Sequence, residues 1–147
     1  MTIIQSQIEH LDDLAPLFDA YRVFYKQCSN LERATRFLKD RITKKDSIIY
    51  IAYIETVAVG FTQLYPTFSS VTMEKMYVLN DLYVNPNYRG NNVGQHLIEE
   101  AKTLCIDNNY KGLALQTAFN NPAQHLYERL DFIKETDLHY FWTNNNK

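Results

Sequence analysis

The hydrophobic pattern changes its period twice along the chain, and this change constrains the fold more than any other feature of the sequence. In residues 12–27 and 29–42, apolar side chains recur every three or four positions, which predicts two amphipathic helices. The chain then becomes rich in Ile, Val, Tyr and Phe, which predicts three successive strands at 47–55, 57–66 and 72–86. A chain with this order must combine helices with a sheet.

Shorter elements complete the predicted order. A strand is expected at 2–5, a turn at Glu55–Thr56, and a short buried strand at 112–118. The helical period returns in a third helix, which carries on one face Val93, Leu97, Ala101 and Leu104.

The last part of the chain predicts a helix and then strands. The helix spans 120–130, with Asn121 as N-cap and Pro122 at its first position. One or two further strands are expected within 132–142, and 143–147 is expected to be a disordered tail. The order β-α-α-β-β-β-α-β-α-β predicts one mixed α/β or α+β domain spanning residues 1–147.

Composition excludes several classes of function. The formal net charge is −2, which argues against a nucleic-acid partner or an anionic membrane surface. No apolar run reaches the ~18 residues that a membrane span needs. The first residues lack a basic stretch followed by an apolar one, so no signal peptide is expected. Cys28 and Cys105 lie far apart and suit a reduced, cytoplasmic protein.

The junction from Tyr83 to Ala101 reads as a strand, a turn and the start of a helix. The first turn of a helix leaves N–H groups unpaired and carries partial positive charge, which suits a phosphate. Gly90 and Gly94 permit a close approach, and Arg89 can add charge-assisted hydrogen bonds. Asn92 tolerates the left-handed backbone conformation. A glycine-containing turn with no ligand is the alternative interpretation, and this motif alone does not exclude it.

A second group of residues lies about thirty positions downstream. Asn120, Ala123 and Tyr127 are spaced to line one side of a short helix that follows a strand. Neither G-x-x-x-x-G-K-[ST] nor G-x-G-x-x-G occurs in the chain, so a nucleoside triphosphate or dinucleotide site is not expected.

Three features together, a V-x-P strand end, R-G-x-x-x-G and N-x-x-A-x-x-x-Y, resemble the GNAT superfamily of acetyl-CoA-dependent N-acetyltransferases. The motifs lie between Asp81 and Phe132, and the order of elements extends the resemblance to the rest of the chain. The resemblance implies a central mixed, largely antiparallel sheet flanked by about four helices. In this fold the sheet splays between the strands around residues 79–84 and 112–118.

The resemblance also implies a binding site for the cosubstrate, acetyl-CoA. The turn would hold the pyrophosphate, the strand Leu82–Val84 would pair with the pantetheine arm, and Asn120 would contact that arm, with Ala123 beside it on the same helix. The implied cofactor-binding set is therefore Leu82, Tyr83, Val84, Arg89, Gly90, Asn91, Asn92, Val93, Gly94, Gln95, Asn120, Ala123 and Tyr127.

The chain departs from the family pattern at two positions. Asn92 stands where the family usually has glycine, which weakens the pyrophosphate prediction only slightly because asparagine is the most tolerant replacement. Asp131 replaces the glycine of Y-x-x-x-G-F, and this change is expected to alter a helix C-cap rather than the chemistry.

Three residues are the predicted catalytic groups. A lysine-like amine is protonated at neutral pH, so a base is needed, and Asp81 is the first candidate, with Glu74 second. An ion-paired or solvated strand residue is the equally weighted alternative for Asp81. By resemblance, the N–H of Val84 would stabilise the oxyanion and the hydroxyl of Tyr127 would protonate the leaving thiolate. A core tyrosine is the alternative for Tyr127, and the spacing with Asn120 and Ala123 favours catalysis.

The resemblance implies a primary amine as acceptor and leaves open a polyamine, another small amine or a peptide. The aromatic residues that could line its pocket are Tyr21, Tyr25, Tyr65, Phe68, Tyr77 and Tyr140. No metal site is expected, and the apolar HYFW segment at 139–142 offers an edge for a homodimer. The alternative function is a catalytically silent acyl-CoA-binding or regulatory module.

Overall fold

A computed structural model describes residues 1–147. The chain divides into two compact units, Met1–Gln116 and Thr117–Lys147, and each is described by itself. The first unit contains the sheet and three of the α-helices, and the second contains one short helix.

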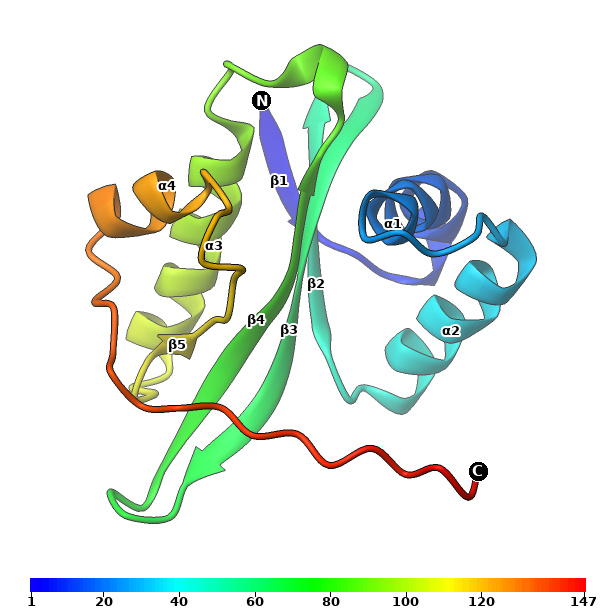
Figure 1. Cartoon of the computed structure of the whole chain (residues 1–147). Coiled ribbons are helices and arrows are strands. Elements are labelled where there is room, and N and C mark those ends of the chain that lie inside the picture. Colours follow the sequence, from blue (N-terminus) through cyan, green and yellow to red (C-terminus); the bar gives the residue numbers. More distant parts are fainter. The chain divides into compact units, whose positions relative to one another are not determined.

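A five-stranded sheet forms the centre of the first unit. Its strands lie in the order in which they occur in the chain (Figure 1): β1 (Thr2–Gln5), β2 (Ile48–Ile54), β3 (Val57–Ser69), β4 (Glu74–Val84) and β5 (Leu113–Ala114). The first four strands pair antiparallel, and β5 alone runs parallel to its neighbour β4. The predicted mixed, largely antiparallel sheet is confirmed.

Helices cover both faces of this sheet (Figure 1), because each apolar face of a sheet must be buried against another element. On one face lie α1 (Leu11–Phe24) and α2 (Leu31–Lys44), which correspond to the two predicted amphipathic helices. On the other lies α3 (Val93–Asp107). Short 3-10 turns precede α1 at Ile8–His10 and follow β4 at Pro86–Tyr88.

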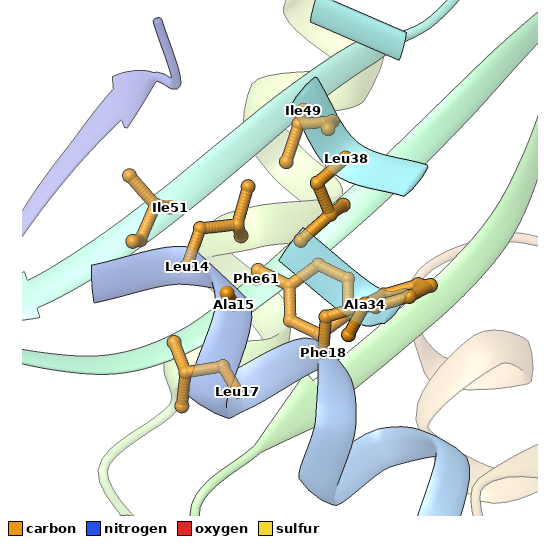
Figure 2. Packing of buried hydrophobic residues seen from close by; sticks show 9 residues of the cluster. All are labelled: Leu14, Ala15, Leu17, Phe18, Ala34, Leu38, Ile49, Ile51 and Phe61. Atoms are coloured by element: carbon orange, nitrogen blue, oxygen red, sulfur yellow. The ribbon is translucent and has the colours of Figure 1, made fainter. Parts of the chain in front are cut away.

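The core under α1 and α2 is built from their inward faces and two strands. Figure 2 shows the cluster, in which α1 provides four side chains, α2 two, β2 two and β3 one: Leu14, Ala15, Leu17, Phe18, Ala34, Leu38, Ile49, Ile51 and Phe61. Each is less than 9% exposed, so the two helices are held firmly against the sheet.

On the opposite face, Gly60 of β3 sets how closely α3 approaches the sheet. A Cβ at this position would lie 2.8 Å from the carbonyl oxygen of Tyr83 and 3.2 Å from Cγ1 of Val93. Only glycine therefore allows β4 and the first turn of α3 to lie this close to β3.

The sheet opens between β4 and β5, as predicted. The two strands pair only at Tyr77–Leu113 and Val78–Ala114, so β4 continues from Leu79 to Val84 without a strand neighbour on that side. The predicted strand 112–118 is thus shorter than its sequence suggested, because only two of its residues find partners on β4.

The second unit contains α4 (Gln124–Arg129), which begins later than predicted. Ala123 is the N-cap, and the expected cap, Asn121, lies in the preceding turn, where its Oδ1 accepts a hydrogen bond from the N–H of Ala123 at 2.9 Å. At the end of the helix, Asp131 takes the left-handed conformation that glycine usually adopts at this position. This residue has a φ of 69°, and the N–H of Phe132 donates to the carbonyl of Tyr127 at 3.0 Å.

The prediction of one or two strands within 132–142 is wrong. No strand occurs there, and the large apolar side chains are between 78% and 86% exposed: Ile133, Leu138, Tyr140, Phe141 and Trp142. The sequence pattern of a strand is local, whereas a strand exists only when a neighbouring strand accepts its hydrogen bonds.

Candidate active site

A buried carboxylate lies at the point where β4 leaves the sheet. Asp81 is 2% exposed, and its two carboxylate oxygens accept hydrogen bonds from Nδ2 of Asn80 at 2.7 Å and Nε2 of Gln63 at 2.6 Å. Gln63 is itself held by the hydroxyl of Ser47, which donates to its Oε1 at 3.0 Å. The side chain of Asp81 is therefore fixed in one position.

A β-bulge explains how Asp81 comes to face inward. Gln63 of β3 pairs with Asp81, whereas the next residue, Leu64, pairs with Leu79, so Asn80 is an extra residue on β4. A bulge bends the strand and re-aims the side chains that follow it. The bulge lies just beyond the point where the pairing of β4 with β5 ends.

Burial raises the pKa of Asp81, and hydrogen bonds from Asn80, Gln63 and Tyr21 oppose this rise only in part. A carboxyl group with a raised pKa is a better proton acceptor than an exposed aspartate. Such a group, when it lies in a cleft, is a candidate for acid–base chemistry.

Asp81 lies on the wall of a pocket of about 400 Å³ between α1, α2, β3 and β4. Much of the pocket wall is aromatic. The aromatic side chains that line it are Phe18, Tyr21, Phe37 and Tyr65. A pocket of this size accommodates a small molecule and lies near the lower end of the usual range for ligand sites.

Two tyrosine hydroxyls share the pocket with Asp81. Burial, followed by the charge of Asp81, raises the pKa of both Tyr21 and Tyr65. Both phenols therefore stay protonated at neutral pH and act as hydrogen-bond donors or acceptors without carrying charge. The hydroxyl of Tyr21 donates to the carbonyl oxygen of Asn80 at 3.3 Å, so it also holds the bulge.

The other predicted aromatic residues lie elsewhere. Tyr25 is 54% exposed and reaches the pocket only indirectly, because its ring centroid lies 5.0 Å from that of Tyr21. Phe68 is exposed, and Tyr77 is buried against Tyr110. Tyr140 lies in the second unit and is exposed.

Glu74, the second candidate base, is the exposed first residue of β4 and does not line the pocket.

Several residues of the pocket were not singled out from the sequence as pocket residues. They are Phe18, Arg22, Gln27, Arg33, Ala34, Phe37 and Asn80. Helical spacing was the available signal, because Arg22 lies four residues after Phe18 on α1, and Phe37 lies three residues after Ala34 on α2. Which face of each helix points to the pocket and which to solvent depends on packing, and the sequence does not give it.

The backbone beyond Asp81 offers hydrogen-bonding groups at the open edge of β4. The N–H of Asn85 donates to the carbonyl of Val59 at 2.8 Å, so Asn85 faces β3. Because successive residues of a strand point their polar groups to opposite sides, Val84 faces away from β3. Its N–H has no strand partner, and its carbonyl accepts a hydrogen bond from Nε of Arg89 at 3.3 Å.

The turn after β4 has the backbone that the sequence predicted. Gly90 has a φ of 87°, and Asn92 adopts the left-handed conformation with a φ of 60° as the N-cap of α3. The side chain of Asn92 makes no capping hydrogen bond, so the amide groups of Val93, Gly94 and Gln95 in the first turn of α3 are not covered by a side-chain cap.

Four features of this loop suit a pyrophosphate. The first-turn amides of α3 provide donors, and a Cβ placed on Gly90 would meet nothing within 4 Å, so its surroundings are open. Arg89 adds a positive charge from an exposed position. Asn91 stiffens the loop, because its Nδ2 donates to the carbonyl of Tyr88 at 2.9 Å.

The remaining predicted residues lie in the second unit. Ala123 and Tyr127 are one turn apart at the start of α4, where the N–H of Tyr127 donates to the carbonyl of Ala123 at 3.1 Å. Asn120 is exposed in the turn before the helix. The Tyr127 ring is half-buried and lies 6.0 Å, centroid to centroid, from Phe132.

Other titratable side chains do not gather into a second centre. Cys105 is buried, and burial raises the pKa of its thiol. No group of three or more His, Cys, Asp or Glu side chains is placed to hold a metal ion. None of the helices is both long and apolar enough to cross a membrane.

Comparison with known proteins supports one family. The model of the Acetyltransferase (GNAT) family matches residues 13–132, which include the pocket, the loop and α4. The chain is 42% identical over 145 residues to an uncharacterized N-acetyltransferase, YhfO, of Bacillus subtilis, covering 98% of this chain and 97% of that protein.

Solved structures agree with this result. A crystal structure of a probable acetyltransferase superposes with a TM-score of 0.92 and 35% identity, covering 100% of this chain and 99% of that one. The fold is also that of the aminoglycoside N-acetyltransferase AAC(6')-Iy in complex with CoA, with a TM-score of 0.81 and 19% identity, over 98% and 94% of the two chains.

Proposed function

Because this chain belongs to the acetyltransferase (GNAT) family and is an acetyl-CoA-dependent N-acetyltransferase, we propose that its acceptor is a small primary amine bound in the pocket beside Asp81. The observation that carries this proposal is the fixed, buried carboxylate in the wall of a pocket of about 400 Å³. A buried carboxylate attracts an ammonium group, and the aromatic wall adds favourable contacts with a cation.

Asp81 is the proposed proton acceptor. A primary amine with a pKa near ~10.4 must lose a proton before it attacks, and at pH 7 this deprotonation costs roughly 4–5 kcal/mol. The raised pKa of Asp81 suits it to take that proton, directly or through one water molecule. The tyrosine hydroxyls beside it can hold such a water or the amine itself.

The N–H of Val84 is the proposed donor to the oxyanion. It faces the open side of β4, where no strand competes for it. As the amine nitrogen bonds to the thioester carbon, negative charge develops on the carbonyl oxygen, and a fixed N–H stabilises that charge.

Tyr127 is the proposed acid that protonates the departing thiolate. As the carbon–sulfur bond breaks, the phenol proton passes to sulfur, and the phenolate recovers a proton from solvent or from the nitrogen of the adduct, which loses it as the amide forms. The support for this role is the position of Tyr127 on α4, one turn after the N-cap Ala123, and the N-x-x-A-x-x-x-Y spacing within the region that the family model matches.

The residues proposed to hold the cosubstrate are those of the family motifs. The loop Arg89–Asn92 and the first-turn amides of Val93, Gly94 and Gln95 would bind the pyrophosphate, and Leu82, Tyr83 and Val84 would pair with the pantetheine arm. Asn120 and Ala123 would contact the same arm. Acetyl-CoA supplies the activated acetyl group, and the chain supplies position, charge and protons.

The role of Tyr127 is tested by Tyr127→Phe. We expect kcat for thiol release to fall by about 10²-fold or more, as for loss of a general acid, with the KM for acetyl-CoA little changed. Thiol release is followed with a chromogenic disulfide across a panel of amines, polyamines, amino acids and a lysine peptide. Unchanged kcat at saturating amine would exclude this role. No observation favours the catalytically silent module.

Two further properties belong to this proposal. The exposed Tyr140, Phe141 and Trp142 form an apolar surface that we assign to a homodimer contact. The free thiols of Cys28 and Cys105 suit a reducing compartment, which supports a cytoplasmic location.

A further inference from the structure

The pocket beside Asp81 also contains two arginines, which a site for a simple amine does not require. Arg22 of α1 and Arg33 of α2 both line it, together with Gln27 from the connection between these helices. A cationic acceptor such as a polyamine would meet repulsion from these charges at one part of the pocket and attraction from Asp81 at another.

Arg22 has structural partners that occupy its guanidinium. Its Nη1 donates to the carbonyl of Cys28 at 3.1 Å and lies 3.5 Å from Oδ1 of Asp19. Asp19 in turn accepts hydrogen bonds from the hydroxyl of Ser29 at 2.5 Å and the N–H of Asn30 at 2.8 Å. Arg22 therefore joins α1 to the connection that precedes α2, and Asp19 is its counter-ion.

Arg33 has no such partner. Its guanidinium makes no ion pair or side-chain hydrogen bond, whereas Arg36 pairs with Glu32 at 2.6 Å and Arg41 pairs with Asp46 at 2.9 Å. Of the three arginines of α2, only Arg33 lines the pocket, and only Arg33 lacks a counter-ion. The pocket thus presents one uncompensated cation to whatever binds there.

We propose that the acceptor is an amino carboxylate, whose amine lies beside Asp81 and whose carboxylate is bound by Arg33. This inference rests on the proposed function and specifies its substrate class.

The chemistry of the two groups supports this orientation. The planar guanidinium of arginine matches a carboxylate with two parallel N–H donors, and the side-chain amide of Gln27 offers a further donor at the same wall. The amine cannot take this position, because arginine has only donors and a fixed positive charge. Asp81 and the neutral tyrosines then form the one part of the pocket that accepts an ammonium group.

The size of the pocket agrees with this class. A volume of about 400 Å³ suits a molecule of the size of an amino acid or a short amino-acid derivative. The aromatic walls formed by Phe18 and Phe37 would contact the apolar part between the two charged groups.

The test uses matched acceptors that differ only in the carboxylate. Each amino acid in an α- and ω-amino series is compared with its amide and its decarboxylated amine, for example lysine, lysinamide and 1,5-diaminopentane. In at least one set, we expect the wild-type chain to have a kcat/KM for the amino acid that exceeds the values for its amide and its decarboxylated amine by about tenfold or more. This is the effect expected of a charge-assisted hydrogen bond.

Arg33→Gln should reduce this preference to near unity, because it removes the charge and keeps a polar side chain. Arg33→Glu should reverse it in favour of the diamine. Arg36→Gln is the matched control on the same helix, since Arg36 pairs with Glu32 outside the pocket, and the carboxylate preference should remain.

Two outcomes would overturn the inference while leaving the transferase function intact. One is equal or better turnover of the decarboxylated amines by the wild-type chain, and the other is a preference that survives in Arg33→Gln. Absence of thiol release with every amine would instead contradict the proposed function. Calorimetric titration of the same matched sets into the protein then tests the substrate class by binding alone. We expect the amino acids to bind more weakly to Arg33→Gln than to the wild-type chain.

Discussion

At the scale of single residues, Asp81 combines burial, fixed hydrogen bonds and a place in the pocket wall. Burial of a carboxylate is unfavourable, because the charged form loses solvation that two amide donors only partly replace. A protein that retains such a group accepts lower stability at that position in exchange for reactivity. The raised pKa of Asp81 therefore affects both the stability of the fold and the ability of the carboxylate to accept a proton.

This leads to a prediction about the pH dependence of stability. Because the pKa of Asp81 is higher in the folded than in the unfolded chain, its protonated form stabilises the fold. That contribution is complete below the unfolded value of 3.8 and is lost as pH rises through the folded pKa. The free energy of unfolding of the wild-type chain, minus that of Asp81→Asn, should therefore fall as the pH rises above ~4.

Urea unfolding of both chains across this range measures the difference. Asn keeps the size of the side chain but cannot titrate, so it isolates the ionisation of this one group. A difference that stays constant with pH, or that grows as pH rises, would show that the pKa of Asp81 is not raised in the folded state.

At the scale of elements, the strands and helices that bury an apolar face followed from the sequence. Helical period and runs of β-branched residues are local properties of a sequence. They predicted six elements that the structure contains: α1, α2, α3, β2, β3 and β4. The bulge at Asn80 did not follow, because it depends on the register between β3 and β4. Asp81 could thus be named from the sequence, but its burial could not.

The structural role of Gly60 in β3 also could not be predicted from the sequence. Glycine inside a strand is unfavourable, and the reason for it here is a contact with Tyr83 of β4 and Val93 of α3 that pattern analysis cannot see. Because Tyr83 and Val93 flank the loop proposed to bind pyrophosphate, this close approach sets the position of that loop relative to β4.

We predict that Gly60→Ala lowers the free energy of unfolding by about 1–3 kcal/mol, the usual effect of overpacking. The added Cβ would lie 2.8 Å from a backbone oxygen, which cannot rotate away as a side chain can. Chemical denaturation measures the loss. Stability equal to that of the wild-type chain would show that β4 and α3 shift apart at no cost and that the contact is unimportant.

At the scale of the whole molecule, the family and its fold were predicted correctly and the final strands were not. The motifs around Arg89–Gly94 and Asn120–Tyr127 identified the family, because their spacing is specific. Residues 132–142 have the composition of a strand, yet none of them forms one. Strand formation needs an edge supplied from elsewhere, and composition does not reveal whether one is present.

The exposed end of the chain leads to a prediction about assembly. If Tyr140, Phe141 and Trp142 form a homodimer contact, replacing a central aromatic group by a charge should dissociate it. We expect sedimentation analysis to give a dimer for the wild-type chain and a monomer for Trp142→Lys. Met73→Lys is a suitable control, because Met73 is 90% exposed and lies in the turn between β3 and β4. A wild-type monomer at all concentrations would contradict this assignment.

Whether this chain acetylates a small amine with Asp81 as base is measured by thiol release from acetyl-CoA in wild type and Asp81→Asn. We predict saturable turnover by the wild-type chain with one class of amine. We also predict that Asp81→Asn lowers kcat/KM for that amine by about 10²–10⁴-fold at neutral pH, as for loss of a general base, and that raising the pH partly restores the rate. Full activity of Asp81→Asn at neutral pH would contradict this role of Asp81.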